Sequence, residues 1–123
     1  MTRHFCRLIQ DRSMGAVVET ITREVLSWPG VTSAPHRFGG TEFRLGRIEL
    51  GHLHGNRLAD LPFPRALRDE LVEKGEAEPH HVLPHTGWVS RRIGSADDVT
   101  AVIRLFRQNY DRVVSRRRSA DFM

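Results

Sequence analysis

Five of the seven histidines in this 123-residue chain fall in two short segments. The first segment, IELGHLH at residues 48–54, holds His52 and His54 with one residue between them. The second segment, EAEPHHVLPH at residues 76–85, holds His80, His81 and His85. Imidazole changes charge near neutral pH, so each ring could act as a base, an acid or a metal ligand. If the two segments face each other, several imidazoles meet in one pocket.

The His-x-His spacing allows a metal site. On a regular strand, side chains two residues apart share a face and lie about 6.5 to 7 Å apart at the backbone, so His52 and His54 could reach one ion. The third ligand would be Glu49 or a loop histidine, and His81 completes the set that we expect if a divalent metal is bound. Glu49 would point to the opposite strand face unless Gly51 introduces a bulge. The sequence has no cysteine pair and no His-Glu-x-x-His helix to support a metal.

A metal-free acid–base site is the interpretation that we favour. It needs a histidine within reach of an acidic proton and a donor that holds the resulting anion. His52, His54 and one loop histidine, His80 or His81, could divide these catalytic roles. No phosphate-cradling glycine loop and no dinucleotide fingerprint occurs, so we expect no resident flavin or nicotinamide cofactor.

Two aromatic residues, Trp88 and Phe43, could wall such a pocket and accept a flat substrate, although core packing would also explain both rings. Asp60 and His85 are further candidates for substrate contact. Asp60 could instead pair with an arginine or cap a turn. The histidines themselves could be structural, bonded to backbone groups or lying in solvent.

The elements that must position these residues can be read from periodicity. Apolar residues recur at helical spacing over 16–28, and short alternating segments near 31–38, 41–45 and 47–54 predict an antiparallel meander. On a regular third strand, His52 and His54 would share a face with Ile48 and Leu50. The segment RLADLPF at 57–63 adds a possible fourth strand.

The second half of the chain has clearer boundaries. Pro64 suits the first turn of a helix and Gly75 the position just past its end. The two prolines of residues 76–85 predict a loop, and GWVSRRI at 87–93 predicts a strand. Ser95 caps a last helix whose apolar stripe reaches Val114. The predicted fold is α+β, a small antiparallel sheet with three helices packed on it.

Length and composition indicate one domain over residues 1–123, with an N-terminal arm at 1–15 and a C-terminal tail at 115–123. No apolar run is long enough to span a bilayer, and the N-terminus is too charged for a signal peptide, so we expect a cytoplasmic protein without membrane contact. The single cysteine, Cys6, excludes an internal disulfide.

The net charge of +4 comes almost entirely from arginine, which could indicate nucleic-acid binding. The arginines are spread along the chain, with only SRRRS near the end forming a cluster, and few aromatic residues lie among them. We therefore expect a small-molecule ligand as the partner and regard nucleic acid as the less favoured one. The sequence does not indicate an oligomeric state.

With these residues in view, the chain resembles the luciferase-domain family of small bacterial proteins, which shares its domain with the fungal luciferases. The resemblance covers roughly residues 35–114 and is carried by HRFGGTEFRLGRIELGHLH, ADLPFPRALRDELV, PHHVLPHTGWVS and DDVTAVIRLFRQNYDR. The fungal enzymes oxidise a hydroxylated pyrone with molecular oxygen. The resemblance implies a Glu-x-x-His-x-His pattern on Glu49, His52 and His54, a functional loop histidine at His80 or His81, and a functional Trp88.

The fungal enzymes are longer and carry an N-terminal membrane-anchoring region, which we do not expect in this chain. A weaker resemblance to MmcQ/YjbR-like proteins, in the tryptophan strand and the helix carrying NYDRV, implies a double-winged α+β fold sometimes proposed to bind DNA. The leading hypothesis is a cofactor-independent oxygenase using molecular oxygen as co-substrate. A small-molecule or nucleic-acid binding module without catalysis is the alternative.

Overall fold

The computed structural model of the chain describes residues 16–36 and 39–121. Six strands form one antiparallel sheet in the order β1-β2-β3-β4-β6-β5. Their bounds are β1 Val31–Pro35, β2 Thr41–Leu45, β3 Ile48–His54, β4 Leu58–Pro62, β5 Glu78–Pro79 and β6 Trp88–Arg92. The helices comprise residues 16–26, α2 at Arg65–Glu73 and α3 at Ala96–Asp121. The predicted α+β class, three helices packed on an antiparallel sheet, is confirmed, whereas the narrower MmcQ/YjbR-like description stays a prediction.

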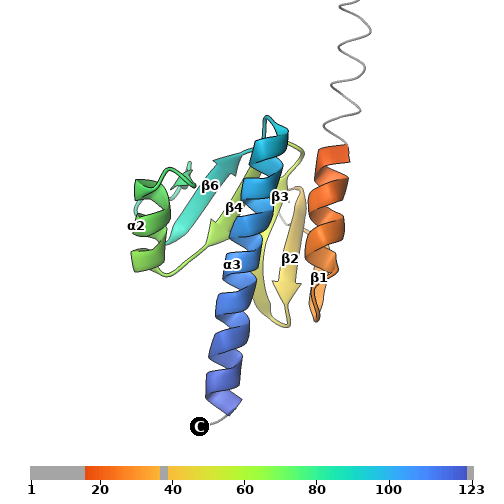
Figure 1. Cartoon of the computed structure of the whole chain (residues 1–123), viewed down its shortest axis with the longest axis vertical. Helices are drawn as coiled ribbons and strands as arrows, with labels where there is room; N and C mark the ends of the chain where they lie inside the picture. Colours follow the sequence, from red (N-terminus) through yellow and green to blue (C-terminus); the bar gives the residue numbers. More distant parts are fainter. Residues whose placement is uncertain (1–15, 37–38, 122–123) are drawn as a thin grey trace, which may run out of the picture.

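The long helix α3 crosses the sheet over β3 and β4, with the helix of residues 16–26 beside it and α2 next to β6 (Figure 1). The core lies between α3 and the sheet. Phe43 of β2 meets Phe106 of α3 edge to face with ring centroids 5.4 Å apart, and both rings are fully buried. Asn109 of α3 donates a hydrogen bond to the carbonyl oxygen of Leu50. This buried polar contact fixes where α3 lies along β3.

A bulge interrupts the pairing of β2 with β3. Phe43 pairs with Gly51 and Arg44 pairs with Glu49, so Leu50 has no partner of its own on β2. The extra residue shifts the side-chain alternation of β3 by one position. The prediction that the strand histidines share a face with Leu50 is therefore wrong, because Leu50 and Leu53 enter the core while His52 and His54 point to the opposite face.

The predicted loop over residues 76–85 contains the two-residue strand β5, and this part of the loop prediction is wrong. β5 pairs with β6 at the edge of the sheet, with Pro79 opposite Val89. An edge strand tolerates proline because one side of its backbone needs no ladder partner. The predicted first strand ends at Pro35, and its residues 37–38 lie outside the described part of the chain.

The helix ends follow the capping residues. Gly75 has a φ of +75° just beyond α2, as predicted. At the start of α3, the Ser95 hydroxyl accepts the Asp98 backbone N–H at 3.2 Å, and the Asp98 carboxylate accepts the Gly94 N–H at 2.8 Å and pairs with Arg91 at 2.7 Å. α3 continues through Asp121, so residues 115–121 of the expected tail are helical.

Several arginines have structural contacts. Arg117 donates to the Leu45 carbonyl oxygen at 3.0 Å, and Arg107 lies over the rings of Trp28 and Tyr110 at 5.3 and 5.2 Å.

Within the described residues, the helices lack the combination of length and apolar character that crossing a bilayer requires.

The bulge can be tested at its glycine. Gly51 has a φ of +152°, and a Cβ there would lie 2.8 to 2.9 Å from the Asp60 carbonyl oxygen, Leu61 and Phe106. We expect Gly51→Ala to lower the free energy of unfolding by about 3 kcal/mol, combining backbone strain with overpacking. Gly55→Ala is the matched control, because Gly55 has a φ of +57° but open space where the alanine Cβ would lie, and should cost only about 1 kcal/mol. Equal losses in urea titrations of the two variants would contradict this account.

The start of α3 gives a second test. The Gly94 N–H and the Arg91 guanidinium hold the pKa of Asp98 below its ordinary value of 3.8. The stabilisation is therefore complete above the unfolded-state pKa and is lost as the pH falls through the lower folded-state pKa. Asp98→Ala should lower the free energy of unfolding by about 1 kcal/mol at pH 7, and the loss should shrink below pH ~4. Asp97→Ala, one residue earlier and exposed, should show a smaller loss in the same denaturation series.

Candidate functional site

The candidate site lies on the sheet face opposite to α3. In β4, Ala59 and Leu61 belong to the core, so Asp60 between them points to the other face. There, a pocket of about 410 Å³ opens under the loop that follows β5. It is lined by His36, His52, His54, His80, His81, Val82, Leu83 and Trp88.

Strand register brings the polar residues into one row across the sheet. Glu42 of β2 pairs with His52 of β3, which pairs with Asp60 of β4, which pairs with Ser90 of β6. All four side chains are buried. Residues that are directly opposite on neighbouring strands have side chains in contact, so the row is a continuous polar strip beneath the pocket.

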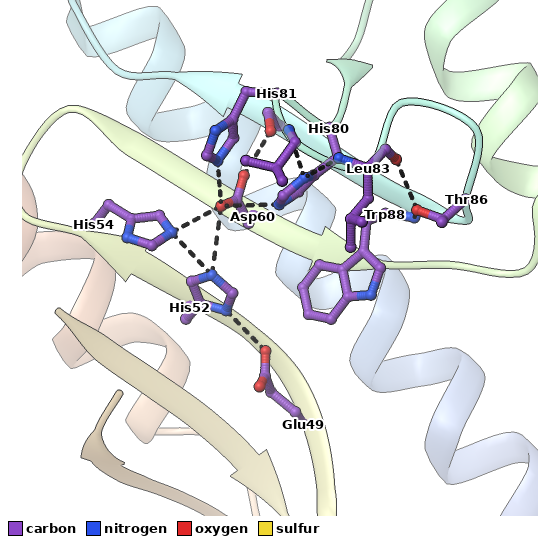
Figure 2. Close-up of polar contacts among 11 residues, drawn as sticks. Glu49, His52, His54, Asp60, His80, His81, Leu83, Thr86 and Trp88 are labelled. Atoms are coloured by element: carbon purple, nitrogen blue, oxygen red, sulfur yellow. Dashed lines mark hydrogen bonds and ion pairs between the residues drawn. The ribbon is translucent and has the colours of Figure 1, made fainter. Parts of the chain in front are cut away.

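Asp60 is the centre of the cluster. Its Oδ2 lies 2.8 Å from Nε2 of His54, 3.2 Å from that of His81 and 3.4 Å from those of His52 and His80. Its Oδ1 accepts the Ser90 hydroxyl at 2.5 Å. Figure 2 shows the four rings pointing toward this one carboxylate from β3 and from the loop after β5. Burial would raise the pKa of Asp60, but the hydrogen bonds from His52, Ser90 and His81 outweigh it and hold the pKa well below the ordinary value.

His52 is bonded at both ring nitrogens. Nδ1 lies 2.9 Å from Glu49 Oε2, and Nε2 lies 3.0 Å from His54 Nε2. Burial lowers the pKa of His52, whereas hydrogen bonds to Asp60 and Glu49 raise it, and the net result is a pKa of about 9. The bulge places Glu49 on the same face as His52. The sequence predicts that Glu49 faces away from the histidines unless Gly51 introduces such a bulge. The ring of His36 stacks on the ring of His52, with centroids 3.9 Å apart.

His80 has a defined tautomer. Its Nδ1 accepts hydrogen bonds from the backbone N–H groups of Val82 at 3.1 Å and Leu83 at 3.0 Å, so Nδ1 carries no proton. The ring proton of a neutral His80 therefore resides on Nε2, which points at Asp60. Burial lowers the pKa of His80 and so favours this neutral form. His81 contacts Asp60 through Nε2 and is half-exposed.

The donor atoms fit either proton transfer or metal binding. Among the residues that the structure describes, three sets each hold their ligand atoms within 4.8 Å of one another: His36, Glu49 and His52; His52, His54 and Asp60; and Asp60, His80 and His81. Every set includes His52 or Asp60.

The comparison with protein families identifies the domain. Residues 47–109, just over half of the chain, match the family model of the Luciferase domain. The chain belongs to this family. No curated protein and no solved structure matches it. The matched residues include β3, β4, α2, β5 and β6, and with them all of the clustered site residues except His36.

Within the Luciferase domain, most of the residues proposed from the sequence come together. Glu49, Asp60, Trp88 and the four histidines at 52, 54, 80 and 81 all adjoin the pocket or its floor. Asp60 pairs with histidines, not with the arginine or turn that the sequence suggested as alternatives. Phe43 is placed elsewhere, in the core against Phe106, and His85 is exposed and outside the pocket lining.

The sequence reading missed four contributors to the Luciferase-domain pocket and its floor: His36, Val82, Leu83 and Ser90. His36 follows β1 directly, and its ring stacks on that of His52 although β2 lies between β1 and β3. A serine at the centre of a predicted strand was the available signal for Ser90. The apolar pair between the loop histidines and Trp88 was the signal for Val82 and Leu83.

The tautomer of His80 can be observed directly in the Luciferase domain. We expect long-range ¹H–¹⁵N spectra of chelator-treated protein to show His80 with an unprotonated Nδ1 and a protonated Nε2, because two backbone N–H groups occupy Nδ1. The His80→Gln spectrum provides the assignment. A protonated Nδ1 would contradict the hydrogen bonds from residues 82 and 83.

Proposed function

We propose that this Luciferase-domain protein is an oxygenase-type enzyme that acts on a flat enolic or phenolic small molecule. The observation that carries the proposal is the convergence of four imidazoles on the buried Asp60 at the floor of one pocket. Clusters of titratable groups in a concave site are the usual mark of catalysis. Membership in the Luciferase domain family favours oxidation over other reactions of such a cluster.

The pocket walls favour a flat and largely apolar substrate. The Trp88 ring lies 5.5 Å from the His52 ring and 5.9 Å from the His80 ring, which leaves aromatic surfaces along one side. Val82 and Leu83 on the rim are 68% and 45% exposed and lie next to each other. A bound ring system would cover them. The volume of about 410 Å³ suits a molecule of drug-like size or smaller.

The substrate hydroxyl needs a base, and His81 fits this role better than His80. Both nitrogens of His80 are engaged, Nδ1 by backbone N–H groups and Nε2 by Asp60. The half-exposed His81 uses Nε2 toward Asp60, which leaves Nδ1 to receive the substrate proton. A carboxylate behind an imidazole holds the ring in place and stabilises the cation that forms.

The reaction that follows adds dioxygen to the substrate. After its hydroxyl proton passes to His81, the electron-rich enolate carbon forms a bond to molecular oxygen. The substrate loses two electrons and the oxygen is reduced to a peroxide, which takes the proton back from His81. Enol and dioxygen thus give a hydroperoxide next to a carbonyl group, with all atoms and electrons retained. Breakdown of this hydroperoxide depends on the substrate.

Oxygen uptake tests the proposal. Purified protein is incubated with a panel of hydroxylated pyrones and phenols, uptake is followed with an oxygen electrode, and products are analysed by mass spectrometry after labelling with ¹⁸O₂. We expect uptake with at least one member and two ¹⁸O atoms in the initial adduct. His81→Ala should lower the rate by about 10²- to 10⁴-fold, the usual effect of losing a general base.

His85→Ala is the matched control, because this histidine is exposed, lies in the same loop and does not line the pocket. It should keep the wild-type rate. If a panel compound binds and is recovered unchanged after exposure to oxygen, the protein is a small-molecule binder and not an enzyme. Equal rates for His81→Ala and His85→Ala would remove His81 from the mechanism.

A further inference from the structure

We infer that His52, His54 and Asp60 form a facial site for one divalent first-row transition metal. Two imidazoles and one carboxylate on one face of an ion, with its other positions open, is the donor arrangement of non-haem Fe(II) oxygenases. The inference concerns the pocket of the proposed function, but metal binding is measured without substrate or turnover. The two ideas can therefore fail separately.

The donor atoms already have the spacing that one ion requires. His52 Nε2 and His54 Nε2 are 3.0 Å apart, and Asp60 Oδ2 lies 2.8 Å from the second and 3.4 Å from the first. Ligands bound at about 2.1 Å with angles between 90° and tetrahedral lie roughly 3.0 to 3.4 Å from one another. All three pairs fall close to this range, so an ion could join them with small side-chain adjustments.

Hydrogen bonding alone accounts poorly for the cluster. Asp60 Oδ2 has four imidazole nitrogens within 3.4 Å, whereas one carboxylate oxygen offers two lone pairs. The nitrogens of His52 and His54 also face each other, and that contact can use only one proton. A cation would instead attract both ring nitrogens and the carboxylate oxygen through their lone pairs.

The surroundings orient the proposed ligands. His52 donates Nδ1–H to Glu49, so an ion would take the place of the proton on Nε2, and a carboxylate behind a metal-bound histidine is the common arrangement. His80 is not a ligand, because its Nδ1 accepts two backbone N–H groups and its Nε2 carries a proton. It holds Asp60 from the side, and Ser90 holds the other carboxylate oxygen.

The open side of the ion would border the pocket. His52 and His54 both line it together with Trp88 (Figure 2), and the exposed apolar pair of Val82 and Leu83 lies on its rim. An enolate or phenolate oxygen bound beside Trp88 could thus reach the ion directly. The third ligand of this site is Asp60, whereas the sequence suggested His81 for a metal site. Asp60 Oδ2 is close enough to Nε2 of His52 and of His54 for all three atoms to bind one ion.

Titration of the chelator-treated chain with Co²⁺ alone tests the inference, using calorimetry for stoichiometry and visible absorption for coordination. We expect one equivalent bound, with the spectrum of a five- or six-coordinate ion. His54→Ala and Asp60→Asn should weaken binding at least 100-fold. Glu49→Gln should weaken it about 10- to 100-fold, the range for a residue that orients a ligand. His85→Ala should bind as the wild type does.

His54 is 30% exposed at its side chain, so His54→Ala keeps the test valid even if the fully buried Asp60 proves necessary for folding. Circular dichroism spectra show whether each variant keeps the wild-type secondary structure. Absence of a stoichiometric Co²⁺ complex, or equal binding by His54→Ala and His85→Ala, would overturn the inference. A 1:1 complex lost in His54→Ala supports it even if no panel compound consumes oxygen.

Discussion

The structure is organised around a carboxylate that has no access to water. Asp60 is fully buried in the middle of the sheet, and an unpaired charge in that position would be strongly destabilising. Ser90 and four imidazoles surround it, and removing a buried partner of such a charge, such as His52, typically costs about 3 to 5 kcal/mol. The sheet order that places β4 between β3 and β6 is what makes this compensation available. The cluster is therefore complete only when β3, β4 and β6 are paired.

The bulge at Leu50 and Gly51 connects the sequence to the site. In a regular strand, the two histidines would lie beside Leu50 in the apolar core, and Glu49 would point away from them. One unpaired residue exchanges these faces, so β3 buries leucines under α3 and presents Glu49, His52 and His54 to the pocket. The apparent conflict of imidazoles within an apolar pattern is resolved by backbone geometry.

The sequence predicted the features that depend on local chemistry. Proline and glycine marked the ends of α2, serine marked the start of α3, and the two histidine segments were proposed to meet. Features that depend on register could not be predicted, since a period of two assumes an uninterrupted strand. The central role of Asp60 and the stacking of His36 on His52 depend on contacts between different elements, which the periodicity of a single segment does not specify.

The exposed pair Val82 and Leu83 sits on a connection, while the proposed metal donors sit on two central strands. The backbone N–H groups of Val82 and Leu83 donate to His80 Nδ1, so the main chain of this connection is held in place even where the two side chains project outward. Exchanging these two side chains would alter which compounds enter without disturbing the reacting groups. Under the proposed function, the substrate range would therefore change by substitution at these two positions while the reactive centre stays the same.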